Sequence, residues 1–262
     1  MIAKPALAQS LLHEEDEIAI LTINRPEVHN AINEGVWCDI DAFIDYLNAA
    51  EHIRVGIITG AGKSFIAGGD INCVINFKPL ESVSLVLSAA LVKIEDSKKP
   101  VIAAINGLAY GGGLEIALAC DTRIISERAR FAAPEAGLGL IPGGGGTIRL
   151  GRIVGTSVAK DVVLAGRVLS AEEAITFGLA MKMVPTEEVL PEAIRIAKTM
   201  ARRMGPVALM MGKRAINISM DTDMKTALYV EALSFGLLNG TKDKVEGTSA
   251  FLEKRTPEFK GI

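Results

Sequence analysis

Residues 100–119 read PVIAAINGLAYGGGLEIALA, and this stretch decides the fold. The apolar run at its start predicts a short buried strand that ends at Gly107. The apolar run at its end predicts a helix that begins within the glycines of residues 111–113. The stretch is therefore one unit of strand, glycine-rich turn and helix.

The first half of the chain repeats this alternation of strand and helix. Strands are predicted at residues 18–23, 55–59 and 122–127, and helices at residues 35–50 and 83–97. Such alternation is typical of an α/β protein whose mostly parallel sheet is covered by helices.

After about residue 185 the pattern changes to helices, with no strand pattern between them. Four helices are predicted, at residues 187–204, 206–220, 222–240 and 242–255. Their apolar side chains must be buried either on the chain's own core or on a neighbouring subunit. These side chains include Met210, Met211, Leu233, Phe235, Leu237 and Leu238.

The composition argues against several classes of function. The 262-residue chain has a net charge of −3 at pH 7, so we expect no basic surface for nucleic acid. The N-terminus turns acidic by residue 14, and no apolar run approaches the roughly 18 residues of a membrane span. The three histidines lack partners at ligand spacing, which argues against a metal site. Three scattered cysteines (Cys38, Cys73 and Cys120) predict reduced, mostly buried thiols and a cytoplasmic protein.

Residues 56–70, GIITGAGKSFIAGGD, contain a GAGKS sequence that is similar to a phosphate-binding loop. That loop requires G-x-x-x-x-G-K-[ST], so its first glycine would have to occupy position 57. Ile57 stands there, and Gly56 lies one residue too early, within the predicted strand. The spacing therefore argues against a nucleotide-binding protein.

Two glycine clusters, IAGGD at residues 66–70 and YGGGLE at residues 110–115, each follow a predicted strand. Glycine lets backbone amides approach a ligand without an intervening side chain. The second cluster also opens a helix, whose first N–H groups favour negative charge. The clusters are interpreted either as tight strand–helix turns or as two amides that converge on one oxygen to form an oxyanion hole.

Two glutamates lie in apolar surroundings. Glu115 follows the second glycine cluster in GLEIALAC, and Glu135 lies in FAAPEAGLGLIPGGGG. Glu115 can simply complement the helix dipole, and Glu135 can be an ordinary loop charge. Partial burial would instead raise their pKa values, and a pair of such carboxyl groups suits general acid–base chemistry at carbon.

Five motifs together resemble the enoyl-CoA hydratase (crotonase) family, in the same order along essentially the whole chain. They are NRPEVHNAI (24–32), KSFIAGGDI (63–71), INGLAYGGGLEIALACD (105–121), FAAPEAGLGLIPGGGGT (131–147) and EGTSAFLEKRTPEF (246–259). The resemblance implies an α/β fold built as a spiral of stacked β-β-α turns. It also implies a crotonase core at residues 1–185 and a helical trimerisation region at residues 186–262, with hexamers formed as dimers of trimers.

The resemblance also implies roles for individual residues. The amides of Gly69 and Gly112 would form the oxyanion hole for a thioester carbonyl, and Glu115 and Glu135 match the two catalytic glutamates. The coenzyme A site would be lined by Glu27, Val28, Ala67, Gly68, Gly69, Asp70, Ile71, Gly112 and Pro134. Phe251 and Lys254 of a neighbouring subunit would contact the adenine and the 3′-phosphate. Gly69 and Gly144 stand where alanine is commoner, and neither change removes an amide.

The expected reaction is the addition of water across the 2,3 double bond of a 2-enoyl-CoA. In the family's assignment Glu115 deprotonates the water and Glu135 delivers a proton to C2. No metal or other cofactor is expected, because coenzyme A is part of the substrate. The alternatives are another reaction of the same family, such as double-bond isomerisation or dehydration, and a non-catalytic acyl-CoA-binding protein.

Overall fold

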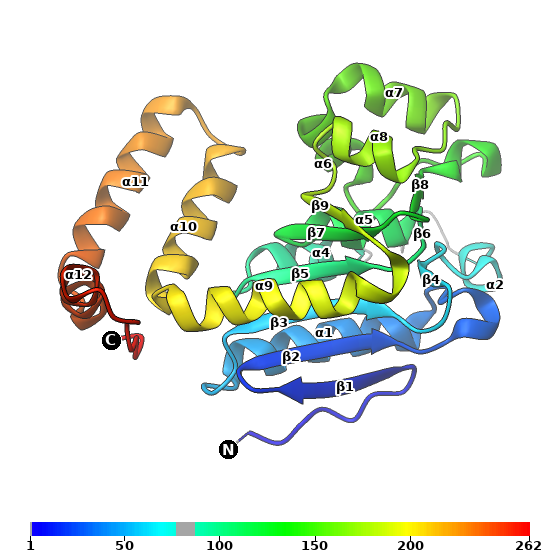
Figure 1. The fold of residues 1–262 in the computed structure, drawn as a ribbon. Coiled ribbons are helices and arrows are strands. Elements are labelled where there is room, and N and C mark those ends of the chain that lie inside the picture. Colours follow the sequence, from blue (N-terminus) through cyan, green and yellow to red (C-terminus); the bar gives the residue numbers. More distant parts are fainter. Residues whose placement is uncertain (1, 77–86) are drawn as a thin grey trace.

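The computed structural model describes residues 2–76 and 87–262, and its strands form two sheets (Figure 1). The larger sheet has the order β1-β2-β3-β5-β7-β9, in which β1 is antiparallel to β2 and all other pairs are parallel. Its strands are β1 (Ser10–Glu15), β2 (Ile18–Ile23), β3 (Val55–Gly60), β5 (Val101–Ile105), β7 (Thr122–Ser126) and β9 (Lys182–Val184). The smaller, parallel sheet contains β4 (Ser64–Ile66), β6 (Leu108–Tyr110) and β8 (Arg130–Ala132).

The strands alternate between the two sheets along the chain. Each of β3, β5 and β7 in the large sheet is followed directly by β4, β6 or β8 in the small sheet, and helices come next. Among the described residues, the helices before residue 185 are α1 (Glu34–Ala49), α2 (Ile71–Val74), α4 (Leu87–Glu95), α5 (Gly112–Ala119), α6 (Gly146–Val154), α7 (Thr156–Leu164) and α8 (Ala171–Thr176). Short 3-10 helices in the same part of the structure cover Pro26–Val28, Pro134–Leu138 and Thr186–Glu188. This repetition is the predicted spiral of β-β-α turns.

Both faces of the large sheet are buried. Alternate residues of β2, β3 and β5 point into a core with α1, α4 and α5, and the other residues point into a second cluster under α9 (Val189–Arg203). Within α9, Val189, Ala193 and Ala197 form one buried stripe at helical spacing. Burial on two faces explains why the parallel strands are continuous apolar runs in the sequence.

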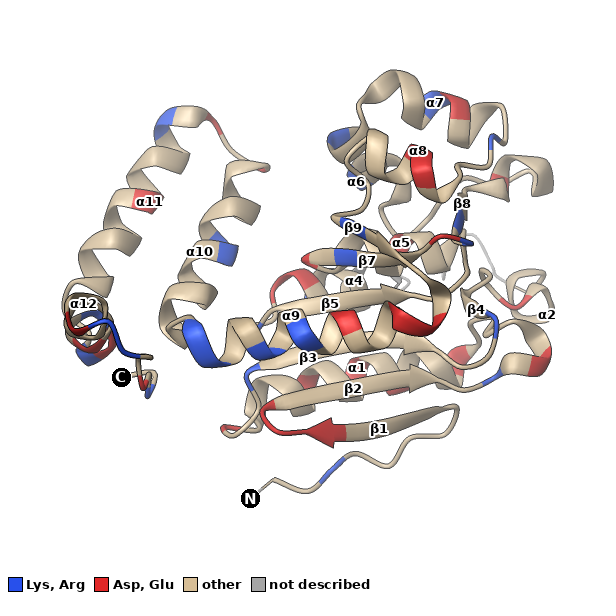
Figure 2. Cartoon of the chain, in the orientation of Figure 1, with Lys and Arg blue, Asp and Glu red and all other residues tan. Residues whose placement is uncertain are grey.

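The remaining three helices extend away from the sheet (Figure 1). They are α10 (Pro206–Ser219), α11 (Met224–Leu238) and α12 (Lys242–Glu253). Neither α10 nor α11 has a buried residue, and large apolar side chains such as Leu228, Tyr229 and Phe235 are exposed. Figure 2 shows few charged residues on these two helices, in contrast to α9. The predicted division of the chain at residue 185 stays a prediction, and α9, just beyond that point, packs on the sheet.

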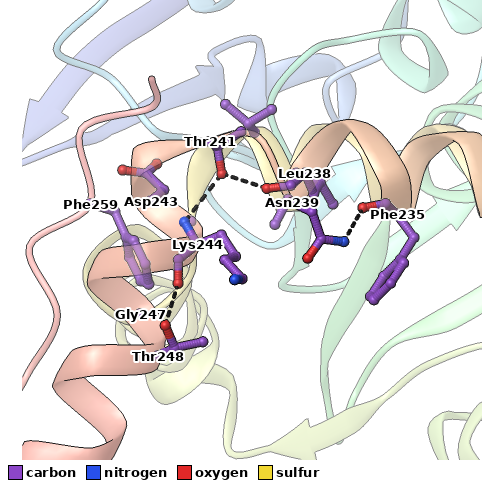
Figure 3. A pocket seen from close by; sticks show the side chains of 12 residues that line it. Phe235, Leu238, Asn239, Thr241, Asp243, Lys244, Gly247, Thr248 and Phe259 are labelled. Carbon is purple, nitrogen blue, oxygen red and sulfur yellow. Dashed lines mark hydrogen bonds between the residues drawn. The ribbon is translucent and has the colours of Figure 1, made fainter.

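Hydrogen bonds and the packing of an aromatic ring hold the C-terminal segment against these three helices. The carboxylate of Asp243 accepts from the N–H groups of Lys260 and Gly261 at 2.8 and 2.7 Å. The ring of Phe259 lies beside Gly247, where it lines a cavity of about 290 Å³ between α10, α11 and α12 (Figure 3). Neither the two glycine clusters nor Glu115 and Glu135 line this cavity.

Several elements were not predicted from the sequence. The strands β4, β6 and β8 have only three residues each, too few for a recognisable alternation. The edge strand β1 and the helices α6 to α8 were also missed. The predicted helix at residues 83–97 is seen as α4, and its residues 83–86 lie outside the described part of the chain.

The prediction of mostly buried cysteines is wrong, since Cys38 is exposed and only Cys120 is buried. None of the helices in the described part of the chain combines the length and the hydrophobicity that a membrane span requires.

A buried asparagine holds the turn between β3 and β4, which contains the GAGKS sequence. Asn30 is fully buried, and its Nδ2 atom donates to the carbonyl oxygens of Ala61, Ser64 and Phe65 at 2.9, 2.8 and 3.1 Å. Its Oδ1 atom accepts from the N–H of Arg25 at 2.9 Å. Asn30 therefore ties this turn to the segment before α1, and the GAGKS glycines serve a structural turn.

We expect Asn30→Asp to lower the free energy of unfolding by about 3 kcal/mol. The change keeps the side-chain shape but turns a donor into an oxygen that faces three carbonyl oxygens. Asn33→Asp is the matched control: Asn33 caps α1 by accepting from Val36 N at 3.0 Å, and aspartate caps equally well. Chemical denaturation followed by circular dichroism measures both variants. Equal stability of the two would contradict the role given to Asn30.

Candidate active site

Three consecutive glycines bring the start of α5 against the end of β4. Gly111 has a φ of +49°, which favours glycine, and its N–H donates to Ala132 O at 2.9 Å. A Cβ atom on Gly113 would lie 2.1 Å from Ile66 O, so only glycine allows this approach. A Cβ atom on Gly111 would lie 3.7 Å from the Cα of Gly68. The two predicted glycine clusters therefore meet in space.

The loop after β4 contains one amide, that of Gly69, without a hydrogen-bond acceptor among the described residues. Ile32 pairs with this loop: its N–H donates to Gly68 O and its carbonyl accepts from Asp70 N, both at 2.8 Å. Within the described residues, the N–H of Gly69 between them has no protein acceptor. The N–H of Gly112, at the first position of α5, likewise has none there. Ile32 links the two segments, because it pairs with the loop around Gly69 and its Cδ1 atom lies 2.9 Å from a Cβ built on Gly112.

Glu115 is buried in the first turn of α5 and is 5% exposed. Its Oε1 atom accepts from the N–H groups of Gly144 and Gly146 at 2.7 and 2.8 Å. Burial raises the pKa of the Glu115 carboxyl above its ordinary value, and the two amide hydrogen bonds oppose this shift. The negative charge of Glu135 also raises this pKa, whereas Arg149 lowers it.

The glycines that follow Pro142 fit closely around Glu115. A Cβ atom on Gly146 would lie 2.9 Å from Glu115 Oε1. A Cβ atom on Gly144 would lie 2.9 Å from Glu115 Oε2 and 2.6 Å from Leu91 Cδ1, so an alanine there would require Leu91 to move. The loop is therefore shaped to hold the Glu115 carboxylate by its backbone.

Glu135 lies in the 3-10 helix Pro134–Leu138 and is half-buried. Its Oε1 atom lies 2.9 Å from a Cβ built on Gly111, which places the carboxyl group beside the start of α5. Its Oε2 atom is buried and has no hydrogen-bond partner among the described residues. Burial raises the pKa of the Glu135 carboxyl. Two carboxyl groups with raised pKa values thus share one site with the glycine amides.

The structure also brings together the N-terminal part of the predicted coenzyme A site. Glu27 and Val28 form an exposed 3-10 turn, and the next residue, His29, accepts through its carbonyl from Ala67 N at 3.1 Å. The Ala67–Ile71 loop thus lies beside this turn. Its Asp70 forms an ion pair with Arg25 at 3.3 Å, and the hydrogen bond from Asn72 N is the largest cause of the lowered pKa of Asp70.

Phe251 and Lys254 lie elsewhere in the same chain. Phe251 is on α12 and is 84% exposed, and Lys254 ends that helix with a φ of +55°. Figure 1 places α12 at the opposite end of the molecule from α2, β4 and β6. The role of these two residues in a neighbouring subunit's site stays a prediction.

The residues that support the site from outside are not predictable from the sequence. Ile32 pairs with the loop around Gly69 and approaches Gly112, Leu91 packs on Gly144, and Arg149 donates to Gly144 O at 2.5 Å. Their positions in the sequence carry no motif that indicates these contacts. Within residues 2–76 and 87–262, no group of three or more His, Cys, Asp or Glu side chains could hold a metal ion.

Comparisons with known proteins show which sequences and structures this chain is similar to. The family model described as enoyl-CoA hydratase/isomerase matches residues 13–262. A protein named crotonyl-CoA hydratase from Syntrophomonas wolfei is 42% identical over 252 residues, which cover 95% of this chain and 96% of that protein. A short-chain-enoyl-CoA hydratase from Clostridium acetobutylicum is 40% identical over 251 residues, with coverage of 95% and 96%.

The crystal structure of an enoyl-CoA hydratase from Bacillus anthracis has a TM-score of 0.92 and 35% identity, covering 97% of this chain and all of that one. A structure from Geobacillus kaustophilus has a TM-score of 0.93 and 35% identity, with coverage of 98% and 99%. Family model, sequence relatives and fold all extend over nearly the whole chain, so this chain belongs to the enoyl-CoA hydratase/isomerase family.

Proposed function

We propose that this chain is a hydratase of short-chain 2-enoyl-CoA thioesters. The observation that carries the proposal is that Glu115 and Glu135 lie in one site with the amides of Gly69 and Gly112, which have no protein acceptor within the described residues. A hydration needs one group that takes a proton from water and one that gives a proton to carbon. The short-chain preference is supported by the names of the relatives at 42% and 40% identity.

The proposed mechanism assigns one task to each group. The amides of Gly69 and Gly112 donate to the thioester oxygen and stabilise the enolate that forms as the C3–O bond is made. Glu115 takes a proton from the attacking water, whose oxygen becomes the 3-hydroxyl. Glu135 gives a proton to C2, so the product is the 3-hydroxyacyl-CoA. The loop amides that hold Glu115 Oε1 keep its carboxylate in place for this step.

A double-bond isomerase of the same family needs only one base, and the presence of both glutamates in this site argues against it. A non-catalytic acyl-CoA-binding protein would need neither carboxyl group. The raised pKa values of Glu115 and Glu135 favour catalysis over binding alone, because carboxyl groups whose pKa is shifted by burial are typical of acid–base sites in enzymes.

An absorbance assay over a panel of 2-enoyl-CoA chain lengths tests the proposal. Hydration removes the conjugated enoyl thioester, so we expect the absorbance to fall fastest with the four-carbon substrate. Binding without turnover on any substrate would support the acyl-CoA-binding protein. Conversion of a 3-enoyl-CoA without hydration of the 2-enoyl-CoA would support the isomerase.

We expect Gly69→Pro to lower kcat by about 10²–10³-fold, because proline has no N–H for the oxyanion. The lost N–H has no protein acceptor in the described residues, so the substitution breaks no hydrogen bond there. Gly69→Ala is the matched control: it keeps the amide, and its Cβ would lie 3.2 Å from Val74 Cγ2, a contact that a small shift relieves. A correctly folded Gly69→Pro enzyme with the parental kcat would contradict the oxyanion assignment.

We propose further that the chain forms a trimer, or a hexamer of two trimers, through α10, α11 and α12. The exposed apolar side chains of these helices support an interface between copies. We expect light scattering at micromolar concentration to give three or six times 27.7 kDa. A monomer would contradict this proposal and with it the role of Lys254 in a neighbouring site.

A cytoplasmic location is also proposed, supported by the three unpaired cysteines of the described chain.

A further inference from the structure

The loop that holds Glu115 is itself held from outside the site. The carbonyl of Gly144 accepts from Arg149 Nη1 at 2.5 Å, while the N–H of the same residue donates to Glu115. Gly145 has a φ of +93°, and a Cβ atom there would lie 2.3 Å from Arg149 Nη1. A glycine at position 145 therefore lets the guanidinium group reach the loop.

The guanidinium group of Arg149 is fixed by a second partner. Its Nε and Nη2 atoms donate to Oε1 and Oε2 of Glu95 at 2.7 and 2.6 Å. Such a two-point pair fixes the plane of the guanidinium group as well as its distance. The side chains of Arg149 and Glu95 are 14% and 33% exposed, so the pair is only partly shielded from water. The third nitrogen, Nη1, is thereby aimed at Gly144.

The helix end that carries Glu95 is anchored from α10. Asn217 Nδ2 donates to Glu95 O at 3.0 Å, and Lys213 Nζ donates to Ile94 O at 3.0 Å. Lys213 also forms an ion pair with Asp121 at 2.8 Å, at the start of β7. The carboxyl end of α4 is therefore a fixed point to which Arg149 can be tied.

We propose that Glu95 and Arg149 are a positioning pair that sets the place of Glu115 through the main chain of Gly144. The inference rests on the proposed hydratase function. Four consecutive glycines at residues 143–146 have no side chains to restrict their own conformation, so an outside anchor is needed. A misplacement of about 1 Å in a reacting group can lower a rate about 100-fold.

The kinetic test compares Arg149→Gln and Arg149→Lys with the control Arg152→Gln. Arg152 lies on the same helix and donates to Asp221 at 2.9 Å, but it does not bond to the glycine loop. We expect Arg149→Gln to lower kcat about 10- to 100-fold with less than about a twofold change in KM. Arg149→Lys keeps the positive charge but loses the two-point hydrogen bonding of the guanidinium group. Its kcat should therefore lie between that of Arg149→Gln and that of the parent. Arg152→Gln should match the parent.

The pH profile separates positioning from a general loss of stability. Arg149 lowers the pKa of Glu115, and Glu135 is the other charged group that acts on it from a neighbouring element. In Arg149→Gln the acid limb of kcat/KM should therefore move to higher pH. Arg149→Lys should return the limb towards its parental position without restoring the parental kcat. A parental kcat in Arg149→Gln would count against the proposal, whether or not the limb moves.

Hydrogen–deuterium exchange of a peptide that covers residues 142–150 gives a readout besides activity. We expect faster exchange in Arg149→Gln and in Glu95→Gln than in Arg152→Gln. Glu95→Gln is the milder change and keeps the proposal testable where Arg149→Gln fails to fold. If kcat and the exchange rate in Arg149→Gln and in Glu95→Gln equal those of Arg152→Gln, the positioning pair is refuted. An inactive parent would instead refute the proposed function, and the exchange measurement would still test the pair.

Discussion

Glu115→Gln is expected to lower kcat for hydration of the four-carbon enoyl-CoA by about 10²–10⁴-fold. The glutamine carbonyl can accept from the N–H groups of Gly144 and Gly146 as the carboxylate Oε1 does, so the loop should keep its conformation. The amide cannot take a proton from water. Substrate binding should survive, because the backbone amides proposed to bind the thioester are unchanged.

Glu34→Gln is the matched control for this variant. Glu34 is also an acidic residue in the first turn of a helix, but it is exposed on α1. If Glu115 only complements the dipole of α5, both variants should retain the parental kcat and lose at most a little stability. A parental rate in Glu115→Gln would thus contradict the role of Glu115 as a base.

The pH dependence of the parent follows from the raised pKa of Glu115. The base acts as a carboxylate, so kcat/KM should fall as pH drops through a pKa above the ordinary carboxyl range. A raised folded-state pKa also means that ionisation of Glu115 costs stability as pH rises through it. The stability of Glu115→Gln relative to the parent should therefore increase with pH across the same range. Thermal melts at several pH values measure this difference.

The parts of the molecule that were predictable from sequence are those with local signals. The apolar runs of β2, β3 and β5 and the glycines before α5 each define their structure within a few neighbouring residues. The glutamates were found for the same reason, because a charge within an apolar run is conspicuous. Their meeting in one site followed from the family resemblance, and the fold brings Glu135 beside Gly111.

The parts that were not predictable depend on contacts between distant residues. Arg149 and Glu95 are separated by 54 positions, and nothing in either local sequence indicates the other. Asn30 reads as a polar residue before a helix, yet it is fully buried because three carbonyl oxygens of a distant turn converge on it. The three-residue strands of the small sheet are likewise defined by their partners rather than by their own residues.

Glu135→Gln is expected to lower hydration by about 10²–10⁴-fold through the loss of the proton donor to C2. Partial burial raises the pKa of the Glu135 carboxyl group, so it holds a proton at higher pH than an ordinary glutamate. Steady-state assays measure the rate, and mass spectrometry measures solvent deuterium at C2 of the product. Exchange at C2 should suffer more in Glu135→Gln than in Glu115→Gln, because only Glu135 is assigned to that carbon.

The double variant Glu115→Gln/Glu135→Gln gives the decisive comparison. Both groups act on one transition state, so its loss of rate should be smaller than the product of the two single losses. A loss equal to that product would indicate two independent effects and would contradict the shared mechanism. If Glu115→Gln leaves hydration intact while Glu135→Gln abolishes it, one base is enough. That result would contradict the two-glutamate mechanism and would leave Glu135 as the one acid–base group that the reaction needs.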